Sequence, residues 1–198
     1  MDAIRLMTVD DLEPIAAMMA RAFYDDPLQV WVVPDDDTRL ETLHRVFAAE
    51  TESEDPNYWY TDTARACAAF WLDPESTFIP ATSGDNVDVL GELLGDGLER
   101  LRLAMDAMVA VHPSTPHFYL EGLGTDPLRQ REGRASAAVR PILDECDRDS
   151  IPAYLEATKE RNVPFYERRG FRVTGTIDVP NGGPRLWTMW RDPQPKRG

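Results

Sequence analysis

A glycine-containing turn in the second half of the chain has the residue types of an anion-binding loop. Gln130, Gly133 and Ala135 fit the pattern Q/R-x-x-G-x-G/A, and the turn follows an expected strand and opens an expected helix. The first backbone N–H groups of a helix have no intrahelical acceptor and lie at the positive end of the helix dipole. A pyrophosphate can bind at such a place. An ordinary strand-to-helix turn is the alternative, because the pattern constrains only three positions.

A second segment, Asn162 to Phe171, lies about 30 residues downstream on the next strand–helix unit. It contains Tyr166, whose phenol is protonated at neutral pH and can donate a proton to a leaving group. Asn162 can contact a ligand, cap the short helix, or do both. Tyr166 can instead be a packing residue. The two segments, in this order and on these elements, form a stronger signal together than either does alone.

The expected strand over residues 118–125 carries candidates for a general base, the group that takes a proton from a nucleophile. Alternation along the strand places Tyr119, Glu121 and Leu123 on one face. Glu121 is the candidate base, with an ordinary surface glutamate as the alternative, and Glu156 on the facing strand is a further candidate. Glycines inside the strand predict a bulge or a close backbone approach.

Hydrophobic periodicity predicts the elements that must position these residues. There is no internal repeat and no long linker. The second half alternates strand, helix, strand, helix, strand, strand. The full expected order is a strand at 4–7, a helix that carries Leu12 to Phe23 and is ended by Asp26-Pro27, a helix at 38–50, a hairpin of 58–61 and 65–72, a helix at 87–111, a strand at 118–125, a helix at 133–147, a strand at 153–157, a helix at 163–169, and strands at 171–179 and 185–191.

With these motifs the chain resembles the GNAT superfamily of N-acetyltransferases. That superfamily uses Q/R-x-x-G-x-G/A for the coenzyme pyrophosphate and N-x-x-x-x-Y-x-x-x-G-F near the thioester. Here the spacing from Asn162 to Tyr166 is one residue shorter. More closely, the chain looks like the puromycin N-acetyltransferase group. The C-terminal half is the more specific part, and its matching segments are Leu123–Pro127, Tyr154–Glu156, Arg161–Asn162, Pro164–Arg168, Gly170–Phe171 and Trp187–Met189.

The resemblance implies one α/β (α+β) domain of the GNAT fold over residues 1–198. Residues 1–112 would form the acceptor-side half, and residues 113–198 the acetyl-CoA-binding and catalytic half. The implied architecture is a central mixed, mostly antiparallel sheet of about six to seven strands with helices on both faces. The strand at Leu123–Thr125 would splay from the strand at Tyr154–Ala157 and admit the coenzyme into the gap.

The resemblance also implies a reaction, in which an acetyl group moves from acetyl-CoA to a primary amine of a small molecule by direct attack in a ternary complex. The amine could belong to an antibiotic-like aminonucleoside, a polyamine or an amino-acid derivative. Tyr166 would be the general acid and Glu121 the general base. The acceptor would lie near Phe23, Tyr24, Trp31 and Tyr119. The expected coenzyme-binding residues are Leu123, Gly124, Thr125, Gln130, Arg131, Gly133, Arg134, Ala135, Ser136, Asn162 and Tyr166.

One departure from the group's pattern concerns charge. Close relatives carry glycine and a basic residue where this chain has Arg131 and Glu132, and a carboxylate beside a pyrophosphate weakens binding unless it points away. Arg129, Arg131 and Arg134 can compensate through charge-assisted contacts. Glu132 therefore raises an alternative function, a catalytically silent domain that binds an acyl-CoA or a partner protein.

Composition excludes several other classes of protein. The chain has 198 residues, a formal net charge of −14 and 42% hydrophobic residues, a globular composition that repels nucleic acid and anionic membranes. No apolar run approaches the roughly 20 residues that a bilayer requires. The two cysteines and three histidines are scattered, so no metal site is expected. We expect a cytoplasmic protein, a monomer or homodimer, that acts on a small-molecule amine.

Overall fold

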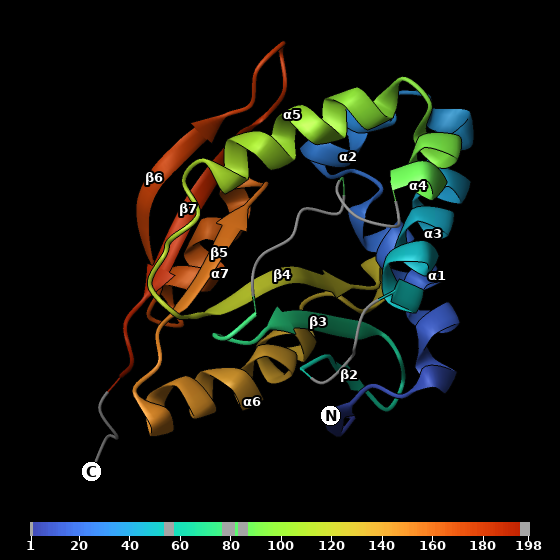
Figure 1. Ribbon diagram of the computed structural model, residues 1–198. Coiled ribbons are helices and arrows are strands. Elements are labelled where there is room, and N and C mark those ends of the chain that lie inside the picture. The colour runs from blue at the N-terminus through green and yellow to red at the C-terminus, as the bar shows by residue number, and fades with distance from the viewer. Residues whose placement is uncertain (1, 54–57, 77–81, 83–86, 195–198) are drawn as a thin grey trace.

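A sheet of seven strands runs through the molecule in the order β1-β2-β3-β4-β5-β7-β6 (Figure 1). The computed structural model describes residues 2–53, 58–76, 82 and 87–194. Neighbouring strands are antiparallel except β4 and β5, which are parallel. The expected mixed, mostly antiparallel sheet is therefore confirmed. The strands are β1 (Ile4–Leu6), β2 (Tyr60–Asp62), β3 (Cys67–Leu72), β4 (Phe118–Thr125), β5 (Ala153–Ala157), β6 (Arg172–Asp178) and β7 (Arg185–Arg191).

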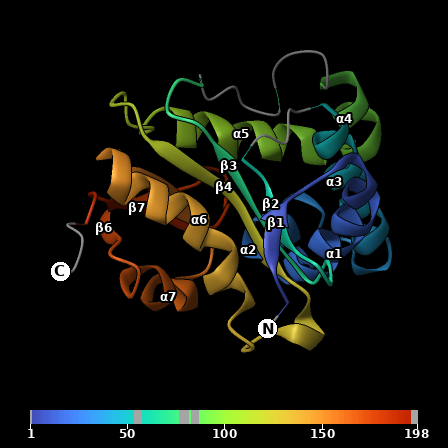
Figure 2. The same cartoon turned by 90° about the horizontal axis from the view of Figure 1, so that it is seen from below.

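Helices cover both faces of this sheet, as expected. Figure 2 shows α6 crossing the sheet on one side and α5 lying on the other. Residues of α6 and α7 form one buried cluster, residues of α1 and α3 a second, and residues of α2, α4 and α5 a third. The helices are α1 (Leu12–Phe23), α2 (Pro27–Val32), α3 (Asp36–Ser53), α4 (Val87–Leu94), α5 (Gly97–Val109), α6 (Arg134–Asp149) and α7 (Val163–Glu167).

The side chains of β3 show how one strand serves two layers. Cys67, Ala69 and Trp71 are buried in the cluster of α6. Ala68 and Phe70 are buried in the cluster of α1. Because both faces of the strand are covered, it reads as a continuous apolar run rather than as an alternating one.

Two expectations about helices are wrong. The single helix predicted over residues 87–111 is broken into α4 and α5 at Gly95, which has the left-handed φ of +52°. An added Cβ on Gly97 would lie 2.6 Å from the Val32 carbonyl oxygen, so the start of α5 packs directly on the backbone at the end of α2. Helix α2 lies in the stretch before residue 38 in which the sequence predicts no second helix. Asp26 caps it by accepting the Leu28 N–H at 3.0 Å, and Pro27 occupies its first position.

Within the described residues, no helix has both the length and the apolar composition needed to cross a bilayer. The same part of the chain contains no group of three or more His, Cys, Asp or Glu side chains arranged to hold a metal ion.

Candidate active site

The two edges of β4 are paired very differently. Against β3 the pairing extends from Cys67 opposite Thr125 to Leu72 opposite Tyr119. Against β5 it consists of Phe118 with Ala153 and Tyr119 with Tyr154. From residue 120 onward β4 therefore presents an open backbone edge toward β5. The splay expected between these two strands is confirmed, and it creates the gap around which the other candidate residues are arranged.

A β-bulge lies at the start of this gap. Trp71 pairs with Leu120 and Phe70 with Gly122, so Glu121 is an extra residue on β4. A bulge shifts the alternation of side chains by one position. Glu121 stays near Tyr119, whose pKa it helps to raise, whereas Leu123 packs in the α6 cluster. The expectation that Tyr119, Glu121 and Leu123 share one face is thus wrong for Leu123.

The glycines of β4 allow α1 to approach closely. A Cβ on Gly124 would lie 2.4 Å from the sulfur of Met19, and one on Gly122 would lie 3.4 Å from the Met19 terminal methyl. Both features predicted from these glycines, a bulge and a close approach, are present. The approaching group is a helix side chain. The side-chain hydroxyl of Thr125 donates to the sulfur of Cys67 at 3.3 Å, so Thr125 can contact a ligand in the gap through its backbone.

The turn that opens α6 has the geometry of an anion-binding loop. Gly133 has a φ of +80° at the N-cap, and Arg131 is also left-handed, with a φ of +64°. The first backbone bond of the helix runs from the Ala137 N–H to the Gly133 carbonyl at 3.1 Å. The N–H groups of the three residues between them precede that bond and point out of the helix end. Arg131 takes a conformation that glycine adopts without strain.

Charges in this turn are compensated within the protein. The carboxylate of Glu132 accepts from Arg129 Nε at 3.1 Å and from Arg134 Nε at 2.8 Å, and these arginines lower its pKa. The guanidinium of Arg134 is buried and also pairs with Asp62 and, at 2.8 Å, with Asp2. Arg134 is therefore committed to protein contacts through its side chain, and only its backbone N–H faces a ligand. Gln130 and Arg131 are exposed beside the turn.

Tyr166 lies on α7 beneath the gap and is 9% exposed. Its ring packs edge-on against Phe165 and Phe171, with centroids 5.1 and 6.0 Å apart. Burial is the main cause that raises its pKa; Asp26 raises it further, while Arg169 lowers it. The phenol is thus kept protonated, as a proton donor must be. Asn162 stands at the N-cap of α7, but its exposed side chain makes no capping hydrogen bond, so it can face a ligand.

Arg169 is a site residue that the sequence did not single out. Its guanidinium stacks on the Phe165 ring, 3.5 Å from the centroid, and donates to the Ser136 hydroxyl in the first turn of α6. Burial lowers its pKa. Its position three residues after Tyr166 was the available signal, because residues so spaced share one side of a helical turn. Arg169 adds a cation between the first turn of α6 and α7.

Acidic residues at the junction of α1 and α2 pair with the segment that follows β5. Asp25 pairs with Lys159 at 2.6 Å and with Arg161 at 2.9 Å. The buried Asp26 accepts a hydrogen bond from the Thr158 hydroxyl at 2.5 Å. These contacts tie the junction of α1 and α2 to the segment that follows β5. The carboxylates are therefore occupied by protein groups.

The aromatic residues expected at the acceptor site lie in separate places. Phe23 packs against Phe47 with ring centroids 5.5 Å apart. Tyr24 donates from its hydroxyl to the Asp36 carbonyl at 3.2 Å. Trp31 packs against the cluster of α2, α4 and α5. Tyr119 belongs to a different group of side chains, described next.

Glu156 and two tyrosines meet on the other face of β5. Burial raises the pKa of Glu156 from 4.5 to about 7, and the nearby hydroxyls of Tyr119 and Tyr154 lower it only in part. Within the described residues, the two carboxylate oxygens of Glu156 have no hydrogen-bond partner in proper geometry. The same holds for the Tyr154 hydroxyl. A buried carboxylate in this state is poised to exchange a proton near neutral pH.

Aromatic rings surround these tyrosines. His112 lies with its ring centroid 5.0 Å from that of Tyr119 and 5.2 Å from that of Tyr154. His117 contacts Tyr154 and Trp190 at 5.5 Å each. Burial, with a smaller effect from His117, lowers the pKa of His112 to about 4, and burial also lowers that of His117. Both imidazoles are therefore neutral at physiological pH.

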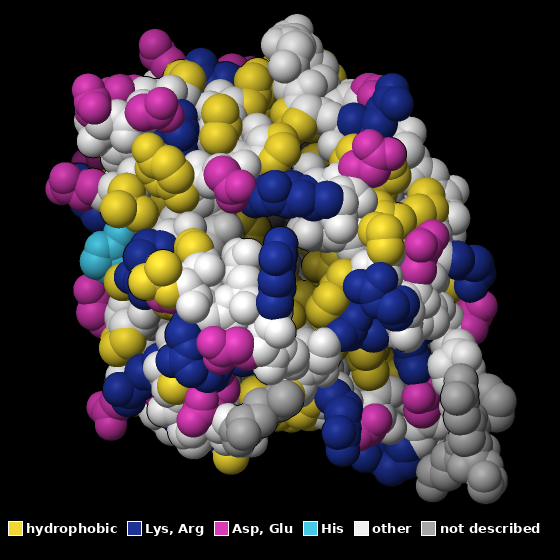
Figure 3. Space-filling model, turned by 180° about the vertical axis from the view of Figure 1, so that it is seen from behind, with side chains coloured by type: hydrophobic (Ala, Val, Ile, Leu, Met, Phe, Trp, Pro, Cys, Tyr) yellow, Lys and Arg dark blue, Asp and Glu magenta, His cyan; other side chains and the backbone are white. Residues whose placement is uncertain are grey.

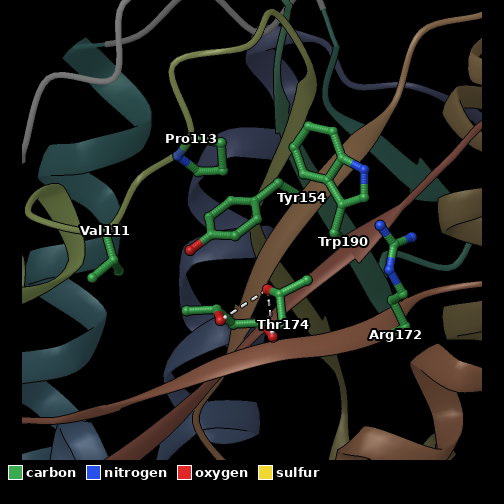
Figure 4. A pocket seen from close by; sticks show the side chains of 7 residues that line it. Val111, Pro113, Tyr154, Arg172, Thr174 and Trp190 are labelled. Carbon is green, nitrogen blue, oxygen red and sulfur yellow. Dashed lines mark hydrogen bonds between the residues drawn. The ribbon is translucent and has the colours of Figure 1, made fainter.

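A hollow of about 310 Å³ opens beside Tyr154 (Figure 4). In Figure 4 the Tyr154 ring lies between Pro113 and Trp190. The side-chain hydroxyl of Thr174 on β6 forms a hydrogen bond with that of Thr188 at 3.0 Å. A second hollow, of about 320 Å³, is lined by Tyr119, His112 and His117 and shares Pro113 with the first. The two hollows flank the pair of tyrosines that border Glu156.

The opposite side of the molecule carries local positive charge despite the acidic composition. Figure 3 shows Lys and Arg side chains around a hollow in the middle of that face, beside hydrophobic side chains. Such local groups can hold a phosphate against a net charge of −14.

Comparison with known proteins agrees with this geometry. A sequence model of the acetyltransferase (GNAT) family matches residues 11–171. The chain is 23% identical to an uncharacterized N-acetyltransferase of Schizosaccharomyces pombe, over 97% of this chain and 84% of that protein. Its fold is similar to a Corynebacterium glutamicum structure described as histone acetyltransferase HPA2 and related acetyltransferase, with a TM-score of 0.75 and 22% identity over 100% of both chains.

A further similar fold is arylalkylamine N-acetyltransferase 2 from Aedes aegypti, with a TM-score of 0.63 and 13% identity over 96% of this chain and 98% of that one. Because the family match covers most of the sequence, from the start of α1 to the residue after Gly170, the chain belongs to the acetyltransferase (GNAT) family.

Proposed function

We propose that the protein transfers an acetyl group from acetyl-CoA to a primary amine of a small molecule. The observation that carries this proposal is the splay between β4 and β5, which leaves an open strand edge ending at a left-handed turn and a helix N-terminus. A long ligand with an amide-containing arm and a pyrophosphate has the chemistry to pair with that edge and that turn in succession. The family assignment supplies the class of reaction.

The coenzyme-binding groups follow from this arrangement. The backbone of Leu123, Gly124 and Thr125 would pair with the pantetheine arm, and Asn162 would contact it from α7. The turn at Gln130–Gly133 and the N–H groups of Arg134, Ala135 and Ser136 would hold the pyrophosphate, assisted by the exposed guanidinium of Arg131. The bound coenzyme supplies an activated acetyl thioester.

The remaining chemistry falls to side chains at the gap. Holding the amine against the thioester lowers the barrier by positioning. Tyr166, buried and protonated, would give its proton to the departing sulfur. The amine must lose a proton before attack, and two carboxylates flank the tyrosines, Glu121 at the bulge and Glu156 on β5. Backbone N–H groups near the bulge would stabilise the oxyanion.

The acceptor would lie on the side of the hollows rather than on the coenzyme side. Tyr154, Trp190 and the neutral histidines suit an amine with an apolar or ring-shaped body. The arylalkylamine specificity of a structural neighbour supports a small amine as the class. Membership of the puromycin N-acetyltransferase group, a cytoplasmic location and a monomeric or homodimeric state stay predictions. Phe23, Tyr24 and Trp31 remain candidate acceptor residues from the sequence.

The alternative function, a catalytically silent domain, was raised because of Glu132, and the contacts of Glu132 weaken that reason. Glu132 was its basis, and that carboxylate is bracketed by Arg129 and Arg134. These two arginines, one of which is shared with Asp62 and Asp2, offset part of its charge before a pyrophosphate binds.

Calorimetric titration with acetyl-CoA tests the proposal, with desulfo-CoA as the control and a thiol-release assay on a panel of amines as the second step. We expect one-to-one binding at micromolar Kd for both coenzymes and thiol release with at least one amine. No binding at millimolar ligand would remove the enzyme function and return attention to a partner protein.

A further inference from the structure

Glu156 is placed where the sheet opens. It follows the last residues of β5 that pair with β4, and it lies opposite Thr188 of β7 on the other edge of the strand. The flanking residues Leu155 and Ala157 are buried in the α6 cluster. Glu156 and Tyr154 therefore face the opposite side, where Tyr154 lines the first hollow and Tyr119, a neighbour of Glu156, lines the second. The topology brings this carboxylate to the mouth of the gap that the coenzyme would enter from the other side.

The surroundings of Glu156 contain groups that cannot neutralise a charge. Its neighbours Tyr119 and Tyr154 are buried phenols, and the imidazoles next to them are neutral. Its two carboxylate oxygens are buried and, among the described residues, lack a hydrogen-bond partner in proper geometry, although the hydroxyls of Tyr119 and Tyr154 lie close enough to lower its pKa in part. A buried carboxylate with no partner is costly to keep in a fold. It becomes favourable when a cationic ligand supplies the missing charge and donors.

We propose that Glu156 is the general base of the reaction, and that its carboxylate binds the acceptor's ammonium group and removes one of its protons. This inference rests on the proposed function. The neutral amine then forms the C–N bond to the acetyl carbon, the C–S bond breaks, and the sulfur takes the phenol proton of Tyr166. The proton that leaves the nitrogen on collapse restores that phenol, and Glu156 later releases its proton to water.

Glu121, the base expected from the sequence, stands in a different environment. It is exposed to solvent at the bulge. Glu156 has the buried setting that adjusts a carboxylate toward neutral pH, which is the condition for an efficient base. The two residues lie on the facing strands of the gap, so a matched pair of substitutions separates their roles.

The tyrosines and histidines around Glu156 have pKa values shifted away from neutral pH, which helps to recognise the ionisation of Glu156. From β4 and β5, Tyr119 and Tyr154 have pKa values raised by burial. From the α5–β4 connection, His112 and His117 have lowered pKa values. Glu121 on β4 is the remaining carboxylate near Tyr119. Across the gap, the pKa of Asp26 is raised by burial and that of Asp25 is lowered, chiefly by Lys159.

The test measures kcat/KM from pH 5 to 9 for an amine chosen from 2-phenylethylamine, tyramine, agmatine and spermidine. We expect the wild-type kcat/KM to rise with pH through an apparent pKa of about 7, the pKa of Glu156, and to reach a plateau above it. Glu156→Gln should lose that rise and about a hundredfold or more of kcat/KM at pH 8, with the Kd for desulfo-CoA unchanged. Glu99→Gln, the same change on an exposed surface of α5, should behave as wild type.

A second variant, Glu156→Asp, tests the inference if Glu156→Gln does not fold. Glu156→Asp keeps the carboxylate but draws it back by one methylene, so it should keep the pH-dependent rise and lose rate. Wild-type rate and pH profile in Glu156→Gln, together with loss of both in Glu121→Gln, would assign the base to Glu121 and overturn this inference alone. Absence of acetyl transfer by the wild type to every amine tested would overturn the proposed function and this inference with it.

Discussion

The turn before α6 and the gap between β4 and β5 each contain a glutamate, and the protein treats the two in opposite ways. Glu132 is exposed and paired with two arginines, which lower its pKa. Glu156 has buried carboxylate oxygens that lack a hydrogen bond within the described residues, and burial raises its pKa to about 7. The first carboxylate is ionised throughout the physiological range. The second changes protonation inside it.

The comparison separates charged groups that are paired within the protein from a carboxylate that is available for chemistry. In the turn, cations and anions cancel within the protein, so the ligand is met by backbone N–H groups whose geometry does not depend on pH. In the gap, no cation of the described residues offsets Glu156, so its state depends on pH and on what binds. Four experiments sharpen or break this contrast.

The largest expected effect is on the pH dependence of stability. The pKa of Glu156 is raised from 4.5 to about 7 in the folded protein. As pH rises, the unfolded chain releases the Glu156 proton at a lower pH than the folded protein does. Protonated Glu156 therefore stabilises the fold fully below about pH 4.5, and this stabilisation is lost as pH rises to about 7. Relative to Glu156→Gln, the wild type should lose on the order of 3 kcal/mol across that window. Urea denaturation at pH 4.5, 5.5, 6.5 and 7.5 measures this difference, and a difference independent of pH would contradict it.

The next effect concerns turnover. Tyr166→Phe removes the proton donor while keeping the ring that packs on Phe165 and Phe171. We expect kcat to fall by about a hundredfold or more and the Kd for acetyl-CoA to stay the same. Stopped assays of thiol release with calorimetry measure both quantities. Tyr60→Phe is the control, and normal turnover in Tyr166→Phe would show that the phenol is a packing residue.

In the turn, the expected effect is on stability. Arg134→Met leaves Asp62 buried without its cation, because both side chains are almost fully covered. We expect a loss of about 2 to 4 kcal/mol and little change in coenzyme affinity, since the helix N–H groups remain. Thermal and urea unfolding measure the loss. Arg140→Met, an exposed position on the same helix, should stay within about 0.5 kcal/mol, and Arg134→Met with Asp62→Asn should recover part of the loss.

The smallest effect belongs to the other member of that network. Glu132→Gln removes a carboxylate that two arginines already offset, so the Kd for acetyl-CoA should fall by only about two- to fivefold. The gain should shrink as salt screens it. Calorimetry at 50 and 500 mM NaCl measures both, with Glu13→Gln as the control. A gain of a hundredfold or more would mean that Glu132 faces the pyrophosphate site directly.

Much of the fold could be predicted because its signals are local. The strand Phe118–Thr125 has the predicted bounds, and glycines announced its bulge. Helix α2 was not predicted, although Asp26 is its cap and Pro27 its first residue. Its six residues are too few to show a helical periodicity. The break at Gly95 was also missed, since its cause includes the packing of Gly97 on the carbonyl of Val32.

The candidate site divides in the same way. The motif around Gln130 and Gly133 and the segment around Tyr166 could be read from residue types and spacing. The pairing of Glu132 with Arg134, and the contact of Arg169 with Ser136, could not, because they depend on side chains meeting across turns and helices. The bulge at Glu121 carried Leu123 to the other face and corrected the alternation that the strand suggested.

The sequence by itself determined the family, most of the order of the elements and the two motifs that flank the gap, because these depend on short-range spacing and backbone preference. The tertiary structure decided which carboxylate is suited to take a proton. Glu121 and Glu156 are the same residue type on facing strands, and spacing cannot separate them. Only burial among Tyr119, Tyr154 and neutral imidazoles raises the pKa of one toward neutrality, because desolvation is a property of the packed fold.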